Sequence, residues 1–163
     1  MKQLFKSIFL VAIISVLLVS CIKERDFPVE PSIEFKQYIA YGRDSADCII
    51  SFKDGDGDIG NNVTSDPDFI LKYLYKDLTT GVFKPYDLDA STPTIMDTLF
   101  YNYRVPNITP DGQYKSLEGE IKAKLRSAPL YFPTHKIVKF EITLRDRAGH
   151  LSNRVTSNEI ILP

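Results

Sequence analysis

Three aspartates alternate with glycines in the middle of the chain, at Asp54-Gly55-Asp56-Gly57-Asp58. On a straight strand, residues two apart share a face but stand roughly 6.5 Å apart, which is too far for their carboxylates to hold one ion. Glycine takes positive φ without steric cost, so Gly55 and Gly57 allow the backbone to curl and bring the carboxylates together. Converging carboxylates repel one another unless a cation joins them. The spacing therefore predicts a site for Ca²⁺, which binds six to eight oxygens at about 2.3–2.6 Å.

This acidic stretch resembles the start of an EF-hand calcium loop, with acids at relative positions one, three and five. The resemblance ends at Ile59 and Ser65, which stand where an EF-hand has its glycine and its bidentate glutamate. Residues 48–52 alternate as a strand does, so the loop is predicted to follow a strand and not a helix. The alternative is a solvated acidic turn without an ion. Further ligands are expected among the loop carbonyls, Asp66, Asp68 and Asp146.

Motifs of known catalytic chemistry are absent from the sequence, which holds no G-x-S-x-G, no H-E-x-x-H and no C-x-x-C. Residues 55–60 fit the pattern G-x-G-x-x-G, but their aspartates would repel a pyrophosphate. His135 and His150 are predicted to be surface loop residues. We therefore expect a protein that is not an enzyme, with no catalytic residue. The alternative is a glycan-active enzyme that uses acids on or near strands, namely Asp97, Glu118 and Glu120.

The first 20 residues are predicted to be the signal peptide of a lipoprotein. Lys2 and Lys6 give a basic start, and residues 8–19 form an apolar run of 12. That run has the length of a signal-peptide core and is shorter than the ~20 residues that span a bilayer. Leu18-Val19-Ser20-Cys21 then resembles a bacterial lipobox, in which the cysteine receives a diacylglyceryl group. Cys21 is therefore the predicted lipidation site, and more than one acyl chain would attach the protein stably to a membrane.

A short tether, residues 21–31, and one domain, residues 32–163, are predicted to follow. The tether is charged and contains prolines, a composition typical of an extended linker. Without the leader, 143 residues remain, with 18 basic and 21 acidic side chains. That length suits one hydrophobic core, and no basic patch for nucleic acid is evident. Cys48 alternates with Ile50 and Phe52, which predicts a buried side chain instead of a nucleophile.

Short segments of alternating apolar residues, separated by turn residues, fill the rest of the chain. Residues 138–144 show the clearest alternation, and residues 155–162 are predicted to be the closing strand. The turn at residues 146–149 is expected to pack near the acidic stretch, which would make Asp146 a further metal ligand. Seven or eight antiparallel strands of this kind predict an all-β protein with an immunoglobulin-like sandwich. The other strands are expected at residues 33–38, 48–52, 69–76, 82–86, 100–105 and 117–125.

Three motifs each occur once in the chain. In order they are D-G-D-G-D-I-G after a predicted strand, I-T-P-D-G followed by L-x-G-x-I, and D-R-A-G-H-L-S-N after the alternating residues 138–144. Together with the lipobox they resemble a group of Bacteroidetes envelope lipoproteins with an immunoglobulin-like domain. The resemblance implies an outer-membrane lipoprotein held in the membrane at Cys21, and the charged residues after Cys21 favour display on the cell surface. We expect a binding or structural role with a protein or glycan partner. The alternative role is an accessory subunit of a nutrient-uptake or adhesion complex.

Overall fold

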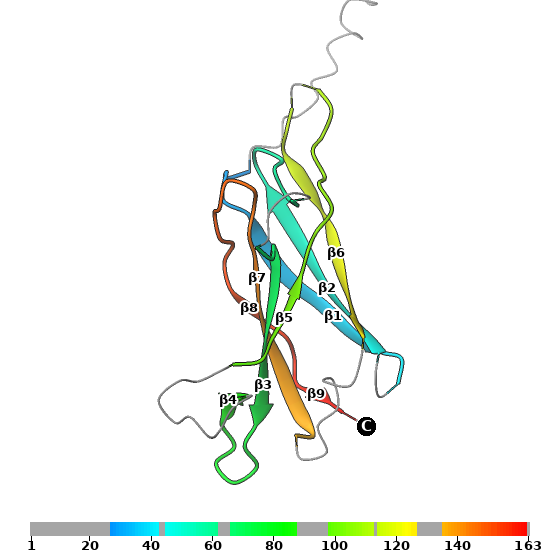
Figure 1. Cartoon of the computed structure of the whole chain (residues 1–163), viewed down its shortest axis with the longest axis vertical. Helices are drawn as coiled ribbons and strands as arrows, with labels where there is room; N and C mark the ends of the chain where they lie inside the picture. The colour runs from blue at the N-terminus through cyan, green and yellow to red at the C-terminus, as the bar shows by residue number, and fades with distance from the viewer. Residues whose placement is uncertain are drawn as a thin grey trace, which may run out of the picture.

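The computed structural model of the chain is all-β, as predicted, and its strands form two antiparallel sheets packed as a sandwich (Figure 1). No helix occurs in the part of the chain that the structure describes, and so none there is long and apolar enough to cross a membrane. The predicted signal peptide and Cys21 lie outside the described residues. The structure describes residues 27–42, 45–61, 66–87, 98–112, 114–126 and 135–162.

One sheet has three strands in the order β1 (Ser32–Ala40), β2 (Ser45–Asp54) and β6 (Leu117–Arg126). The central strand β2 pairs with β6 over its whole length, from Ser45 opposite Arg126 to Asp54 opposite Leu117. Alternate residues of β6 are buried, whereas its charged residues face solvent. The period-2 pattern in the sequence therefore fixes which face of this sheet covers the core.

The second sheet is built around β3 (Phe69–Lys76) and β7 (Ile137–Leu144), which pair antiparallel with Phe69 opposite Leu144. β4 (Phe83–Pro85) and β5 (Phe100–Tyr103) pair with successive halves of the other edge of β3. Two strands of two residues each, β8 (Val155–Thr156) and β9 (Ile160–Ile161), pair with β7.

The predicted closing strand at residues 155–162 is broken into β8 and β9, which brings the described strands to nine. Ser157 lies at the break, where its N–H donates to the carbonyl of Phe140 at 2.9 Å. Its hydroxyl accepts from the N–H of Phe140 at 2.9 Å. A side chain thus replaces one backbone partner in the ladder, and a regular strand cannot continue through that position.

The core lies between the two sheets and consists of the inward side chains of the alternating strands. On β7 these are Val138, Phe140, Ile142 and Leu144, none more than 1% exposed. Cys48 on β2 is also fully buried, and burial raises the pKa of its thiol to about 12. The prediction that Cys48 is a buried apolar side chain is therefore confirmed.

The division of strands between the sheets is that of an immunoglobulin-like sandwich, in which strands A, B and E share one sheet and C, F and G the other. Here β1, β2 and β6 form the first set, and β3, β7 and β8 with β9 form the second. Successive loops consequently gather at the two ends of the sandwich. One of these ends carries the acidic loop.

Candidate metal centre

The acidic loop, residues 54–60, begins where β2 ends and crosses one end of the sandwich. Asp54 is the last residue of β2 and pairs with Leu117. Ile59 forms an isolated antiparallel bridge with Asp146, and its side chain is fully buried in the core. Ile59 therefore anchors the end of the loop, β2 anchors its start, and the acidic residues lie between these two fixed points.

The three aspartates of the loop come together as predicted. Asp54, Asp56 and Asp58 each offer a carboxylate oxygen, and these atoms lie within 4.8 Å of one another. The Oδ2 atom of Asp54 accepts from the N–H of Asp58 at 3.0 Å, and the Oδ2 atom of Asp58 accepts from the N–H of Ala148 at 3.0 Å. Backbone donors thus fix the orientation of two of the carboxylates.

One oxygen of each of these side chains has no donor among the described residues. The Oδ1 atoms of Asp54, Asp56 and Asp58 are excluded from solvent, and none has a hydrogen-bond partner among the described residues. A buried carboxylate oxygen left without a partner costs on the order of 1–3 kcal/mol or more. Native proteins satisfy nearly all their buried polar groups, so three such atoms at one place favour a further partner, which could be a cation, a proton or water.

The electrostatics of the loop favour a cation. Burial raises the pKa of Asp54 to about 6, with a further rise from the charges of Asp56 and Asp58. Burial also raises the pKa of Asp58, and the nearby carboxylates of Asp146 and Asp56 act in the same direction. A divalent cation would supply the counter-charge that these groups lack.

The donor set fits a hard divalent ion. Two oxygens bound to one Ca²⁺ at about 2.3–2.6 Å lie no more than about 5 Å apart. The 4.8 Å spread of the three carboxylate oxygens meets that limit. All three donors are carboxylates, a ligand type that suits calcium and magnesium better than it suits softer metals. Asp54, Asp56 and Asp58 are therefore the residues that would hold such an ion.

The glycines of the loop allow three other segments to approach it closely. A Cβ atom at Gly55 would lie 2.2 Å from the carbonyl oxygen of Phe27, and one at Gly57 would lie 2.1 Å from that of Lys115. At Gly60 the corresponding atom would lie 2.0 Å from the carbonyl oxygen of Pro106. Any side chain at these three positions would displace the segment packed against it.

Conformation alone explains only part of this glycine pattern. Gly57 and Gly60 have positive φ of 68° and 85°, so the predicted curl of the backbone is confirmed at Gly57 and extends to Gly60. Gly55 is not among the positive-φ glycines, so the prediction that it curls the backbone is wrong. Glycine is required there because Phe27 and Pro28 approach it closely. The sequence did not predict that the end of the tether packs against the acidic loop.

Arg147 links the loop to the segment that follows β5, and sequence reasoning did not single it out. Its Nη1 atom donates to the carbonyl of Gly60 at 2.8 Å and to Oδ1 of Asn107 at 2.6 Å. Its Nη2 atom donates to the hydroxyl of Thr109 at 2.7 Å. The pKa of Asp58 is raised by burial and by the neighbouring carboxylates, and the positive charge of Arg147 opposes part of that rise.

The turn at residues 146–149 lies against the acidic loop, as predicted, since the N–H of Arg147 donates to the carbonyl of Asp58 at 3.2 Å. Asp146, however, is not one of the carboxylates grouped within 4.8 Å. Its two oxygens accept from the N–H of His150 at 2.7 Å and contact His150 Nδ1 at 2.8 Å. Its role as a fourth metal ligand therefore stays a prediction.

The other acids proposed as ligands also lie outside the group. Asp66 is exposed and pairs with Arg145 at 3.4 Å. Asp68 is buried, and its Oδ2 atom accepts from the N–H of Val105 at 3.3 Å. Among the described residues, the grouped side-chain ligands are therefore Asp54, Asp56 and Asp58.

The acids considered for a glycan-active enzyme are described only in part. Glu118 and Glu120 are exposed on β6, and Asp97 lies outside the described ranges. His135 lies outside the named strands, as expected, but it is half-buried and stacks on Tyr75 with ring centroids 3.9 Å apart. Its aromatic neighbours account for its burial, which lowers its pKa.

Comparison with protein-family models, with curated proteins and with solved structures found no match to the chain. Inference about its function therefore depends on its own residues: the acidic loop, the segments packed against that loop, and the pattern of the leader.

Proposed function

We propose that this chain is a lipid-anchored protein of the bacterial cell envelope whose sandwich domain binds Ca²⁺ at Asp54, Asp56 and Asp58 and serves a non-catalytic binding or structural role. One observation carries the metal proposal: three aspartates whose carboxylate oxygens come within 4.8 Å of one another each have a buried oxygen without a hydrogen-bond donor among the described residues. The leader and the lipobox ending at Cys21 support the anchor.

Calcium is the preferred ion for physical reasons. Magnesium demands near-ideal octahedral geometry and gives up its waters reluctantly, whereas calcium accepts irregular sets of six to eight oxygens. A loop with three carboxylates and nearby carbonyls offers such an irregular set. Extracellular calcium modules bind at about 10⁻⁴–10⁻³ M, so the proposed envelope location and the proposed ion are consistent with each other.

The position of the loop suggests what the ion does for an anchored domain. Phe27 and Pro28, near the end of the predicted tether, approach Gly55 so closely that no side chain fits there. The ring of Phe27 also lies 5.6 Å from Nζ of Lys53, the residue before Asp54. An ion at the loop would therefore stiffen the junction between the end of the tether and the domain.

The anchor and the ion are tested separately. Cys21→Ala should prevent acylation and remove the protein from the detergent-soluble membrane fraction or stall its processing. Normal maturation with unchanged membrane retention would disprove the anchor. Calorimetric titration of the purified protein with CaCl₂ should show one site that is lost in Asp56→Ala. Glu120→Gln, an exposed acid on β6, serves as the control that should bind as the wild type does.

A further inference from the structure

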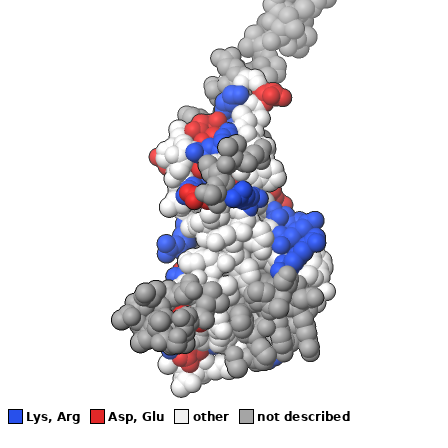
Figure 2. All heavy atoms as spheres, viewed as in Figure 1, with Lys and Arg blue, Asp and Glu red and all other residues white. Residues whose placement is uncertain are grey.

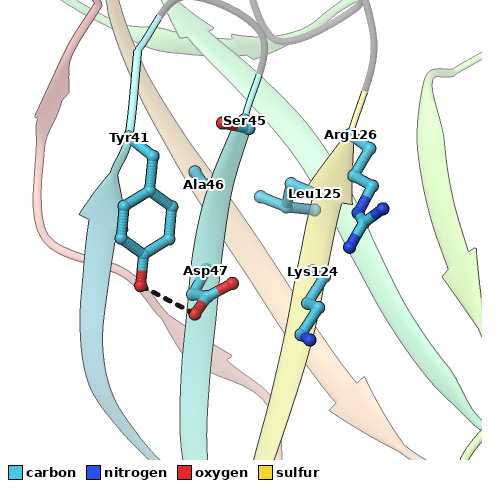
Figure 3. A pocket seen from close by; sticks show the side chains of 7 residues that line it. All are labelled: Tyr41, Ser45, Ala46, Asp47, Lys124, Leu125 and Arg126. Carbon is cyan, nitrogen blue, oxygen red and sulfur yellow. Dashed lines mark hydrogen bonds between the residues drawn. The ribbon is translucent and has the colours of Figure 1, made fainter.

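A second candidate site lies at the opposite end of the three-stranded sheet from the acidic loop (Figure 3). It is an open pocket of about 650 Å³ formed where β1 and β6 end and β2 begins, and we call it the Asp47 pocket. Asp47 and Asp54 are seven residues apart on β2, so the pocket is roughly 23 Å from the acidic loop. Its lining residues are Tyr41, Ser45, Ala46, Asp47, Lys124, Leu125 and Arg126.

An exposed aromatic ring is held in a fixed orientation at this pocket. Tyr41 is 60% exposed, yet its hydroxyl donates to Oδ2 of Asp47 at 3.0 Å, and Asp47 is only 6% exposed. The backbone N–H of Tyr41 also donates to the carbonyl of Ser45 at 2.9 Å. The ring therefore presents an apolar face to solvent without the rotational freedom of an ordinary surface tyrosine. Figure 3 shows its hydroxyl directed at one Asp47 oxygen while the other oxygen points toward β6.

Positive charge gathers on the β6 side of the pocket. Lys122, Lys124 and Arg126 alternate along the exposed face of β6, because residues two apart on a strand share a face. Nζ of Lys122 lies 3.4 Å from Oδ2 of Asp47 and offsets that charge. Within the described ranges, Lys124 and Arg126 have no carboxylate at ion-pair distance. Figure 2 shows Lys and Arg side chains gathered on the side of the molecule where β6 lies in Figure 1.

The chemistry of these groups selects a ligand class. Two cations with no ion-pair partner among the described residues favour an anion, and an arginine pairs well with a carboxylate because its planar guanidinium can donate two parallel hydrogen bonds. A simple phosphate would leave the Tyr41 ring unused, and the Asp47 carboxylate would repel a group that concentrates about two negative charges beside it more than it would repel the single charge of one sugar carboxylate. Asp47 can instead accept hydrogen bonds from hydroxyl groups, and an exposed ring can cover the apolar C–H face of a sugar.

We propose that the Asp47 pocket binds an oligosaccharide that contains uronic acid. Arg126 and Lys124 pair with the sugar carboxylate, Asp47 accepts from its hydroxyls, and the Tyr41 ring stacks on its C–H face. The volume of about 650 Å³ falls within the ~300–1,000 Å³ of ordinary ligand sites. This site goes beyond the proposed function and does not depend on the calcium loop, because the two lie at opposite ends of β2.

The test is calorimetric titration of the purified full-length protein in detergent with trigalacturonate, in a buffer that contains a chelator. The chelator removes any calcium bridge between ligand and protein, so the result is independent of the acidic loop. The matched ligand is the fully methyl-esterified trisaccharide, which keeps all the sugar hydroxyls and a similar size but loses the charges. We expect saturable binding of the acid and at least tenfold weaker binding of the ester. Inorganic phosphate should show no saturable binding at the same concentrations.

Two sets of variants test the assigned contacts. Arg126→Gln and Tyr41→Ala should each weaken trigalacturonate binding at least tenfold, whereas Tyr41→Phe, which keeps the ring, should weaken it less than Tyr41→Ala. Lys36→Gln, an exposed cation on β1 outside the pocket lining, should bind as the wild type does. Absence of trigalacturonate binding at millimolar concentration, equal affinity for the ester, tight phosphate binding, or unchanged affinity of a folded Arg126→Gln variant would each overturn the proposal.

Discussion

Replacement of Asp54 by asparagine should stabilise the ion-free protein and abolish its response to calcium. The new side chain would keep an oxygen to accept from the N–H of Asp58, as Asp54 does at 3.0 Å. Its amide N–H₂ would take the place of Oδ1, which has no donor among the described residues, and would lie on a side chain that is grouped with Asp56 and Asp58. A repulsive contact would thus become a hydrogen-bonded one. Most substitutions at buried positions destabilise, so a gain would be diagnostic.

The expected magnitude comes from the pKa of Asp54. Its native value of about 6 against an ordinary value of 3.8 means that ionisation at neutral pH opposes folding. A difference of about two pKa units corresponds to at most about 3 kcal/mol, and Asp54→Asn should recover about 1–3 kcal/mol of this. Calcium at a hundred times its dissociation constant should add about 2.7 kcal/mol to the free energy of unfolding of the wild type, and nothing to that of the variant.

Scanning calorimetry of the purified protein at pH 7, in 10 mM CaCl₂ and in chelator, measures both effects. Each kcal/mol should shift the melting temperature by roughly 3–5 °C for a domain of this size. Glu120→Gln removes one exposed carboxylate from β6 and should change neither melting temperature by more than a degree or two. Sodium chloride at matched ionic strength separates calcium binding from general screening.

Two results would refute the reasoning. If Asp54→Asn melts at a lower temperature than the wild type in chelator, the Asp54 carboxylate stabilises the ion-free fold, and its burial does not destabilise the protein. If the wild type melts at the same temperature in calcium and in chelator, no ion binds at these concentrations, and the loop is an acidic turn.

Three further outcomes concern the same end of the sandwich. In chelator, wild-type stability should fall as the pH rises from about 4 to about 6. The reason is that native Asp54, with a pKa of about 6, keeps a proton that the unfolded chain releases near 3.8. Thermal melts across that pH range should show this slope in the wild type and not in Asp54→Asn. Gly57→Ala and Gly81→Ala both place a side chain at positive φ, 68° and 73°, but only Gly57 would meet a carbonyl, that of Lys115 at 2.1 Å. Urea unfolding should show a loss of about 1–2 kcal/mol for Gly81→Ala and about 1–3 kcal/mol more for Gly57→Ala, and equal losses would contradict the close approach. The pKa of His150 is raised by its hydrogen bond to Asp146, so the stability from this pair should be complete below pH 6.5 and lost as the pH rises through the higher native value; a difference between wild type and His150→Gln that is the same at pH 5.5 and pH 8.5 would count against it.

The strands and the acidic loop could be predicted from the sequence because both depend on local patterns. Alternation with period 2 identifies strands such as β7, since that period places one set of side chains on the core face whatever the neighbouring strand is. The three aspartates could be grouped because the glycines between them act locally: the curl at Gly57 involves only adjacent residues. The broken closing strand was missed, since the role of Ser157 depends on its partner Phe140 on β7.

The groups that surround each site, in contrast, follow only from the folded arrangement of distant segments. Nothing in the local pattern indicates that Phe27 and Lys115 press on the glycines of the loop, or that the carboxylate of Asp146 is held by His150. The Asp47 pocket likewise exists only because β2 lies between β1 and β6, which brings Asp47 beside Lys122. Such contacts depend on strand order and register, and these are set by how distant segments bury their apolar faces together.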